Sequence, residues 1–150
     1  MTTNVRRKDI VRRLFEGVIN EDRPAVANEF VAPGFINHDD AAGPAGDLTG
    51  PAAFTAGART LKAPCPDFQV RVEDLLAEDD RVIVRWSGRG THTGAFRGQP
   101  PTGRAITNRG IHIFRFEGEQ VVEMWPMMDR LGVLQQLGIL PQLPAPQPAR

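Results

Sequence analysis

The sequence predicts an α+β domain in which helices come first and a curved antiparallel sheet follows. Two patterns support this prediction. Apolar residues recur at the spacing of a helical face near the N-terminus, and from Phe68 onward they alternate with a period of two. The chain of 150 residues has the length of one ordinary domain. We therefore expect a single domain over residues 1–140, with helices covering one face of the sheet, and a Pro-rich tail over residues 141–150.

The N-terminal segment predicts an amphipathic helix. Its apolar residues fall on one helical face and most of its charged residues on the other, which is typical of a helix packed against a core. The apolar face holds Ile10, Val11, Leu14, Phe15, Val18 and Ile19, and the other face holds Arg7, Arg12, Arg13 and Glu16. We interpret the arginine-rich face as a solvated surface.

Two shorter helices are expected before the sheet. The elements predicted are a turn over residues 20–24, a second helix, a short strand over residues 35–38, a loop over residues 39–50 and a third helix over residues 51–61. Asp22 is a candidate N-cap of the second helix. The Pro33-Gly34 pair predicts the end of that helix.

Alternating patterns then predict four long antiparallel strands. They start at residues 68, 82, 106 and 121, and the turns between the first two and the last two fall at Asp79-Asp80 and Glu117-Gly118. Glycines after Trp86 predict a bent or bulged strand, and such a sheet can curl into a half-open cone with a pocket inside. A last helix is expected over residues 131–137, and the prolines that follow cannot join a helix or a central strand.

Composition argues against several classes of function. The 18 basic residues balance the 18 acidic residues, so no global field attracts nucleic acid or an anionic membrane. The N-terminus lacks the apolar core of a signal peptide and no apolar run is long enough to span a membrane, so a cytoplasmic location is expected. The single Cys65 excludes an internal disulfide, and three scattered histidines predict no metal site.

Asp129 is the first candidate for catalysis. It follows a strongly apolar strand and precedes an apolar helix, and burial of an unpaired carboxylate raises its pKa toward neutrality. Such a group can donate or accept a proton near neutral pH. Asp129 could equally cap the helix that begins after it, and the sequence leaves both interpretations open.

Strand alternation predicts which side chains share the cavity with Asp129. One strand contributes Asn108, Gly110, His112, Phe114 and Phe116, and its neighbour contributes Val121, Glu123, Trp125, Met127 and Asp129. The opposite faces carry Ile111 and Ile113 on the first strand and Val122, Met124 and Met128 on the second, where they could pack on helices or on a second subunit. A bulge at Pro126 would reverse the parity between Trp125 and Asp129.

Other candidates each have a structural alternative. Trp86 and Trp125 are either ligand contacts or parts of the core. His112 is either an acid-base group or a structural histidine, and His92 could simply fix a loop by hydrogen bonding. His38 could cap a turn or line the mouth of the cone.

With these residues in view, the chain resembles the SnoaL-like polyketide cyclases, or ester cyclases, of the nuclear transport factor 2-like superfamily. The resemblance runs from about Lys8 to Gly138. It rests on Phe-Ile-Asn-His-Asp from Phe35, Pro-Asp-Phe from Pro66, the segment from Val72 to Val82, Gly-Thr-His-Thr-Gly from Gly90, Pro-Thr-Gly from Pro101, and Trp125 with Asp129 before Leu-Gly-Val-Leu-Gln-Gln-Leu-Gly.

The resemblance implies a cone-shaped α+β barrel, a homodimer formed through the sheet, and catalysis without a metal or organic cofactor. Asp129 matches the position of the acid-base aspartate that drives an intramolecular aldol closure, with His112 assisting. A neighbouring donor, His112 or Asn108, would steady the enolate, and Asn37 or His38 would reach the site from the first strand. The expected contacts to a hydrophobic, carbonyl-bearing substrate are Asn37, His38, Phe54, Trp86, His92, Asn108, Phe114, Glu123, Trp125 and Met127.

Departures from related families leave other functions open. The chain has no tyrosine, which argues against the tyrosine-dependent sites of ketosteroid isomerases and scytalone dehydratase. The expected strands carry no Arg-x-Asp element of the kind found in limonene epoxide hydrolase-like sites. A non-catalytic binding protein, or a related isomerase, dehydratase or epoxide hydrolase, remains an alternative.

Overall fold

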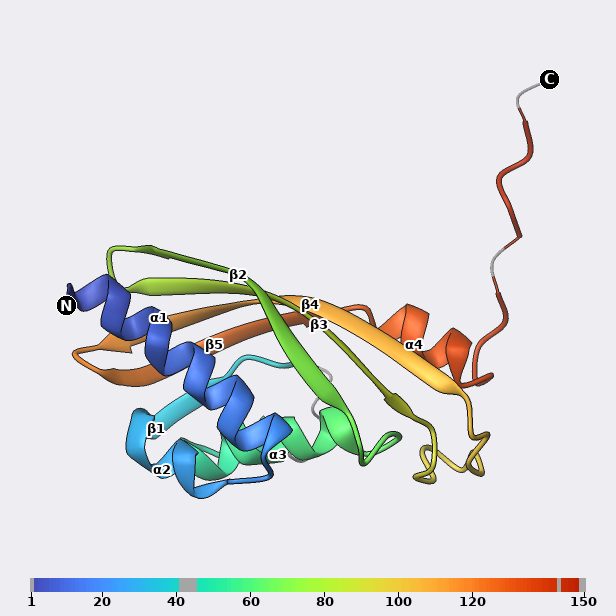
Figure 1. Cartoon of the computed structure of the whole chain (residues 1–150), viewed down its shortest axis with the longest axis horizontal. Helices are drawn as coiled ribbons and strands as arrows, with labels where there is room; N and C mark the ends of the chain where they lie inside the picture. Colours follow the sequence, from blue (N-terminus) through green and yellow to red (C-terminus); the bar gives the residue numbers. More distant parts are fainter. Residues whose placement is uncertain (1, 41–45, 143, 149–150) are drawn as a thin grey trace.

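The computed structural model describes residues 2–40, 46–142 and 144–148. The order of elements is α1 (Thr3–Arg13), the π-helix η1 (Leu14–Asn20), α2 (Ala25–Phe30), β1 (Val31–Asn37), α3 (Gly50–Lys62), β2 (Gln69–Glu78), β3 (Arg81–Thr91), β4 (Ala105–Glu117), β5 (Gln120–Met128) and α4 (Arg130–Gln136). Figure 1 shows α1, α2 and α3 against one face of the curved sheet and α4 at its far end. The predicted α+β architecture, with helices on the concave face, is confirmed.

The sheet has five strands in the order β1-β5-β4-β3-β2. The pairs among β2, β3, β4 and β5 are antiparallel as predicted, but β1 pairs with β5 in parallel. β1 is also longer than predicted, because α2 ends at Phe30 and the chain is already extended at Val31. Pro33 therefore lies inside the strand, which is possible because β1 is at the edge of the sheet.

The N-terminal helix packs as its periodicity predicts. All six apolar residues of its predicted face are buried, from Ile10 to Ile19. The second helix differs, because Asp22 has a φ of 53° in the turn and Pro24 occupies the N-cap position of α2. The prediction that Asp22 caps this helix is therefore wrong.

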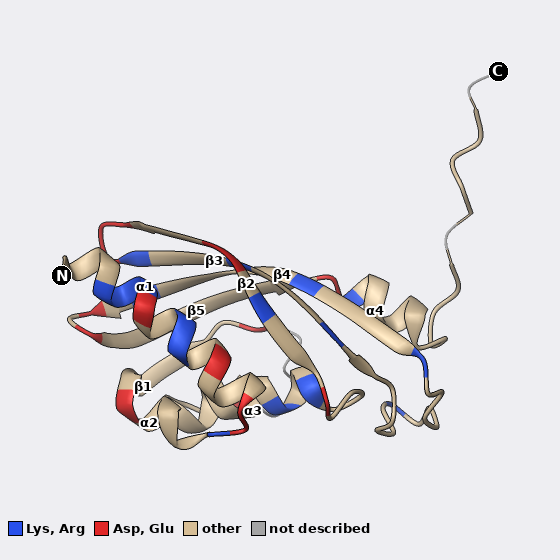
Figure 2. Cartoon of the chain, viewed as in Figure 1, with Lys and Arg blue, Asp and Glu red and all other residues tan. Residues whose placement is uncertain are grey.

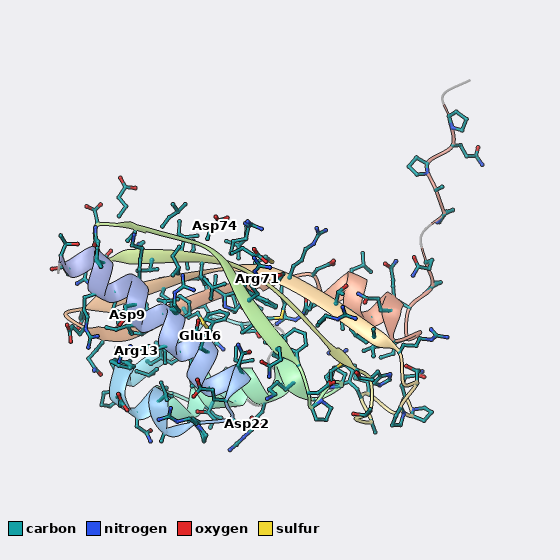
Figure 3. The ribbon with its side chains drawn as sticks, in the orientation of Figure 1. Asp9, Arg13, Glu16, Asp22, Arg71 and Asp74 are labelled. Carbon is teal, nitrogen blue, oxygen red and sulfur yellow. The ribbon has the colours of Figure 1, made fainter. Side chains whose placement is uncertain are left out.

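The charged face of α1 is more than a solvated surface. Along its exposed side Arg13 pairs with Asp9 at 2.9 Å, as the alternating charges in Figure 2 and the side chains in Figure 3 suggest. Nearer the start, Arg7 donates hydrogen bonds to the carbonyl oxygens of Gly118 and Asp79, so one side chain ties α1 to both hairpin turns.

A bulge in β5 exchanges the faces that the sequence predicts. Phe116 pairs with Val121 but Arg115 pairs with Glu123, so one extra residue lies between the two pairs. From Glu123 onward the odd-numbered residues of β5 turn outward, and Met124 turns inward, where it is 5% exposed. The predicted cavity face of β5 is therefore wrong beyond Val121, and the bulge lies before Pro126 rather than at it.

Several predicted segments lie partly outside the described residues. The loop over residues 39–50 includes residues 41–45, and the Pro-rich tail includes residues 143, 149 and 150. Residues 144–148 are exposed, without regular secondary structure, and extend away from the sheet (Figure 1). Within the described residues, no helix has the length and apolarity needed to cross a membrane.

Candidate functional site

A small pocket lies on the inner side of the sheet, between α3, α4, the end of β1 and the segment 92–104. Its volume is about 100 Å³. Apolar side chains supply most of its walls, with Leu61 from α3, Phe96 from the segment 92–104, and Val133 and Leu134 from α4. A cavity of this size holds only a small group, so a larger ligand would extend beyond the pocket.

Three charged side chains line this pocket, Asp39, Arg97 and Arg130, and two of them form an ion pair. One nitrogen of Arg130, Nη2, donates hydrogen bonds to both carboxylate oxygens of Asp39, at 2.9 and 2.7 Å. The Asp39 side chain is 11% exposed and the Arg130 side chain is 39% exposed. A carboxylate is thus held in a mostly apolar pocket by charge-assisted hydrogen bonds from an adjacent guanidinium.

The local sequence explains how this pair reaches the pocket, although our sequence analysis missed both residues. Phe35 is fully buried, and Asn37 and Asp39 follow at intervals of two, so all three point to the same side of the extended chain. Arg130 is the first residue of α4, where the chain turns from β5 into a helix. The Asn-His-Asp-Asp motif was a signal by which Asp39 could have been found. No local pattern indicates that Arg130 points toward the pocket.

Two amides add polar groups to the pocket wall. Asn37 lies at the end of β1, and its buried Oδ1 has no hydrogen-bond partner among the described residues. Asn108 comes from β4 and accepts a hydrogen bond from the backbone N–H of Arg109. The sequence analysis named both amides as substrate contacts, and the structure brings them to one pocket.

His112 lies on the same inner face but deeper in the core. It is 6% exposed, and its ring sits 5.7 Å from the rings of Phe15 and Trp86. Burial, and secondarily the charge of Arg130, lower the pKa of His112 to about 3, so its imidazole is neutral at neutral pH. Among the described residues neither of its ring nitrogens has a hydrogen-bond partner, and the same holds for Nε1 of Trp86.

Asp129 occupies the opposite side of the sheet. Its carboxylate accepts a hydrogen bond from the backbone N–H of Gly132 at 2.9 Å and caps α4. Its side chain is 42% exposed, lies 3.9 Å from Arg109, and is not among the groups that line the pocket. The residue of β5 that pairs with His112 on the inner face is Pro126, which has no acid-base group. The geometry therefore shows a cap, and no hydrogen bond joins Asp129 to His112.

Four further candidates lie on the outer face and outside the pocket. His38 stacks on Trp125 with ring centroids 4.9 Å apart, and its Nε2 lies 3.5 Å from Glu123. A hydrogen bond from Arg115, followed by the smaller effect of His38, lowers the pKa of Glu123. Met127 is 72% exposed. These placements follow from the bulge in β5, which turns Glu123, Trp125 and Met127 outward.

The remaining candidates have structural positions. Phe54 and Phe114 are buried in the core with ring centroids 6.5 Å apart. His92 is fully buried and its Nδ1 lies 2.9 Å from the hydroxyl of Thr102, so it holds the segment that carries Phe96. Burial raises the pKa of the Cys65 thiol to about 11, so this thiol is unreactive at neutral pH.

Comparison with known proteins identifies the family. The model of the SnoaL-like polyketide cyclase family matches residues 9–137, and the chain belongs to this family. The family and the fold, which is of the nuclear transport factor 2-like type, support a cyclase-type function. Comparison with curated protein sequences finds no significant match.

Solved structures of similar proteins agree with this assignment. A candidate polyketide cyclase from Acidithiobacillus ferrooxidans is 28% identical with a TM-score of 0.80, over 93% of this chain and 99% of that one. IdmH, a candidate polyketide cyclase from Streptomyces antibioticus, is 29% identical with a TM-score of 0.76, over 88% and 98%. AclR, a candidate hydroxylase from Streptomyces galilaeus, is 25% identical with a TM-score of 0.78, over 94% and 86%.

Proposed function

We propose that the protein is a cyclase-type enzyme that closes a ring in a hydrophobic, carbonyl-bearing small molecule by acid-base catalysis. The main support is the pocket itself, in which an ion pair and two amides are set into apolar walls, in a chain of the polyketide cyclase family. The apolar walls would bind the carbon chain of the substrate, and the polar groups would orient its carbonyls.

The proposed reaction is an intramolecular aldol closure that uses only acid-base groups of the chain. A base removes a proton from a carbon flanked by two carbonyls, and the resulting carbanion attacks a third carbonyl of the same molecule. Because the flanked carbon is already acidic, one carboxylate in a dry pocket suffices as the base. His112 lies outside the pocket lining, and its lowered pKa keeps it unprotonated at neutral pH, so the proposed reaction does not use it as an acid.

The test is product formation from a synthetic linear polyketone ester, followed by liquid chromatography and mass spectrometry. Leu134 lines the pocket, so Leu134→Trp should fill it and abolish ring closure. Leu131 lies on the same helix but is 50% exposed and outside the pocket, so Leu131→Trp is a matched control that should keep activity. Equal activity in Leu134→Trp would contradict the proposed site.

A non-catalytic binding protein is the second candidate. It is favoured by the exposed, capping position of Asp129 and by Pro126 at the inner-face position beside His112. This alternative predicts that the polyketone ester binds to the wild-type protein, is recovered unchanged, and no longer binds to Leu134→Trp.

We also propose that the protein forms a homodimer through the outer face of its sheet. Large apolar side chains are exposed there on three strands, with Leu76 of β2 at 64%, Ile111 of β4 at 50% and Met127 of β5 at 72%. Ile111→Glu should convert the dimer into a folded monomer in sedimentation velocity. Val5 on α1 is similarly exposed at 45%, so Val5→Glu is the control that should leave the dimer intact. A monomeric wild-type protein would contradict the proposal.

A further inference from the structure

The pocket joins a carboxylate and a guanidinium from segments that are 91 residues apart in the sequence. Asp39 follows the edge strand β1, and Arg130 opens the last helix, α4. Both side chains line the pocket, and the single nitrogen Nη2 of Arg130 donates a hydrogen bond to each carboxylate oxygen of Asp39. The guanidinium group has further N–H donors at Nε and Nη1 that can bind an oxygen.

We propose, on the basis of the function proposed above, that Asp39 is the catalytic base of this enzyme and that Arg130 receives the enolate oxygen. The bond between the flanked carbon and its hydrogen breaks, and the proton goes to the Asp39 carboxylate. The electron pair moves to the carbonyl oxygen. When the enolate carbon attacks the distant carbonyl, the oxygen of that carbonyl takes the proton back from Asp39, so no other reactant is needed.

Electrostatics support this division of roles. Before the proton moves, Arg130 faces the charged carboxylate of Asp39 at 2.7 Å. After the proton moves, Asp39 is neutral and the same negative charge lies on the enolate. Arg130 therefore has one anionic partner throughout, and the apolar walls strengthen that attraction relative to water. The pair can transfer charge to the substrate without leaving an isolated charge in the pocket.

The geometry disfavours the other candidate bases. The Asp129 carboxylate is engaged by the backbone of Gly132 on the opposite side of the sheet. His112 is not among the residues that line the pocket, and both of its ring nitrogens are buried. On β5, the inner-face position beside His112 is Pro126. Of these groups, only Asp39 is a carboxylate that lines the pocket.

The experiment separates proton removal from ring closure. Ethyl benzoylacetate is an apolar β-keto ester whose central carbon exchanges hydrogen for deuterium when it is deprotonated. Its exchange in deuterated buffer is followed by proton NMR, and its affinity is measured by calorimetry. The variants are Asp39→Asn, Arg130→Lys and the double variant Asp39→Asn with Arg130→Gln, which removes both charges together and leaves no buried ion unpaired. Circular dichroism verifies that each variant folds.

The matched control is an ion pair of the same kind on the outer face. Asp74 on β2 receives a hydrogen bond from Arg85 of β3, and both side chains are more than half exposed. Figure 3 shows Asp74 on the strand far from α3 and α4, whose residues line the pocket. Asp74→Asn should exchange the probe at the wild-type rate.

We expect the wild-type protein to accelerate the exchange of the probe. Asp39→Asn should lower this exchange rate by about 100-fold or more and change the affinity for the probe by only about a few-fold. The double variant should lose the same acceleration, and Arg130→Lys should show an intermediate rate. A wild-type exchange rate in folded Asp39→Asn would overturn the assignment of Asp39 as the base and would leave the proposed function intact. Binding without acceleration by the wild-type protein would overturn the proposed function itself.

Discussion

On the inner face of the sheet, His112 and Trp86 bury nitrogen atoms that have no hydrogen-bond partner among the described residues. On the outer face, His38 stacks on Trp125 and approaches Glu123, which is bonded to Arg115. The same residue types therefore meet opposite conditions on the two sides of one sheet. Because burial of an unpaired polar group costs free energy, the inner face accepts a cost that the outer face avoids.

The difference teaches that the face of a strand, and not the residue type, decides which side chains can form the site. Glu123 and Trp125 are chemically suited to a binding site, but the bulge in β5 turns them away from the pocket. Asp39 and Arg130 were not among the residues that the sequence analysis selected, but both line the pocket. Substitutions on the two faces should therefore have different consequences, and the following predictions test this.

The largest expected difference concerns neighbouring strand positions on opposite faces. Phe114 is fully buried, so Phe114→Ala should lower the free energy of unfolding by about 3–5 kcal/mol. Ile111 is half exposed, so Ile111→Ala should cost less than about 1 kcal/mol in dilute protein. Urea denaturation at neutral pH measures both values. Similar losses for the two variants would mean that the outer face is as tightly packed as the inner face.

A smaller effect should appear only in acid and only through the inner face. The pKa of His112 falls from an ordinary 6.5 to about 3 in the folded protein. Below pH 6.5 the imidazole is therefore protonated in the unfolded chain but stays neutral in the folded chain. Stability is therefore fully present above pH 6.5 and is lost as the pH falls. Between pH 7.5 and pH 5 the loss should be about 2 kcal/mol.

Urea denaturation at pH 7.5 and pH 5 tests this prediction. The free energy of unfolding of the wild-type protein should fall between the two pH values. In His112→Leu the fall should be smaller by about the contribution of His112, because leucine cannot bind a proton. An identical pH dependence in the two proteins would show that His112 is not buried in its neutral form.

The sequence predicted more of the fold than of the site, for physical reasons. The helical face from Ile10 to Ile19 and the antiparallel strands follow from local periodicity, which each segment carries by itself. The bulge before Glu123 adds one residue without a local signal, and every side-chain assignment beyond it was reversed. The ion pair between Asp39 and Arg130 depends on a contact across 91 residues, which no local pattern specifies.

The smallest effect concerns Asp129, and it separates the two interpretations that the sequence left open. Asp129→Ala removes the side-chain acceptor for the Gly132 N–H, so α4 should be destabilised by about 1 kcal/mol. Asparagine is about as good an N-cap as aspartate, so Asp129→Asn should change the free energy of unfolding by only about a few tenths of a kcal/mol. Thermal unfolding measures both.

These two variants also bear on the comparison of the faces, because α4 contributes Val133 and Leu134 to the pocket on the inner side. If Asp129 acts only as a cap on the outer side, the rate of ring closure should fall in Asp129→Ala to the extent that α4 is destabilised. In Asp129→Asn, where asparagine caps the helix, the rate should stay near that of the wild-type protein. If instead its charge acts on the substrate, Asp129→Asn should lose activity although α4 is intact. Activity that follows the stability of α4 in both variants therefore identifies Asp129 as a structural residue and leaves the inner face as the location of the chemistry.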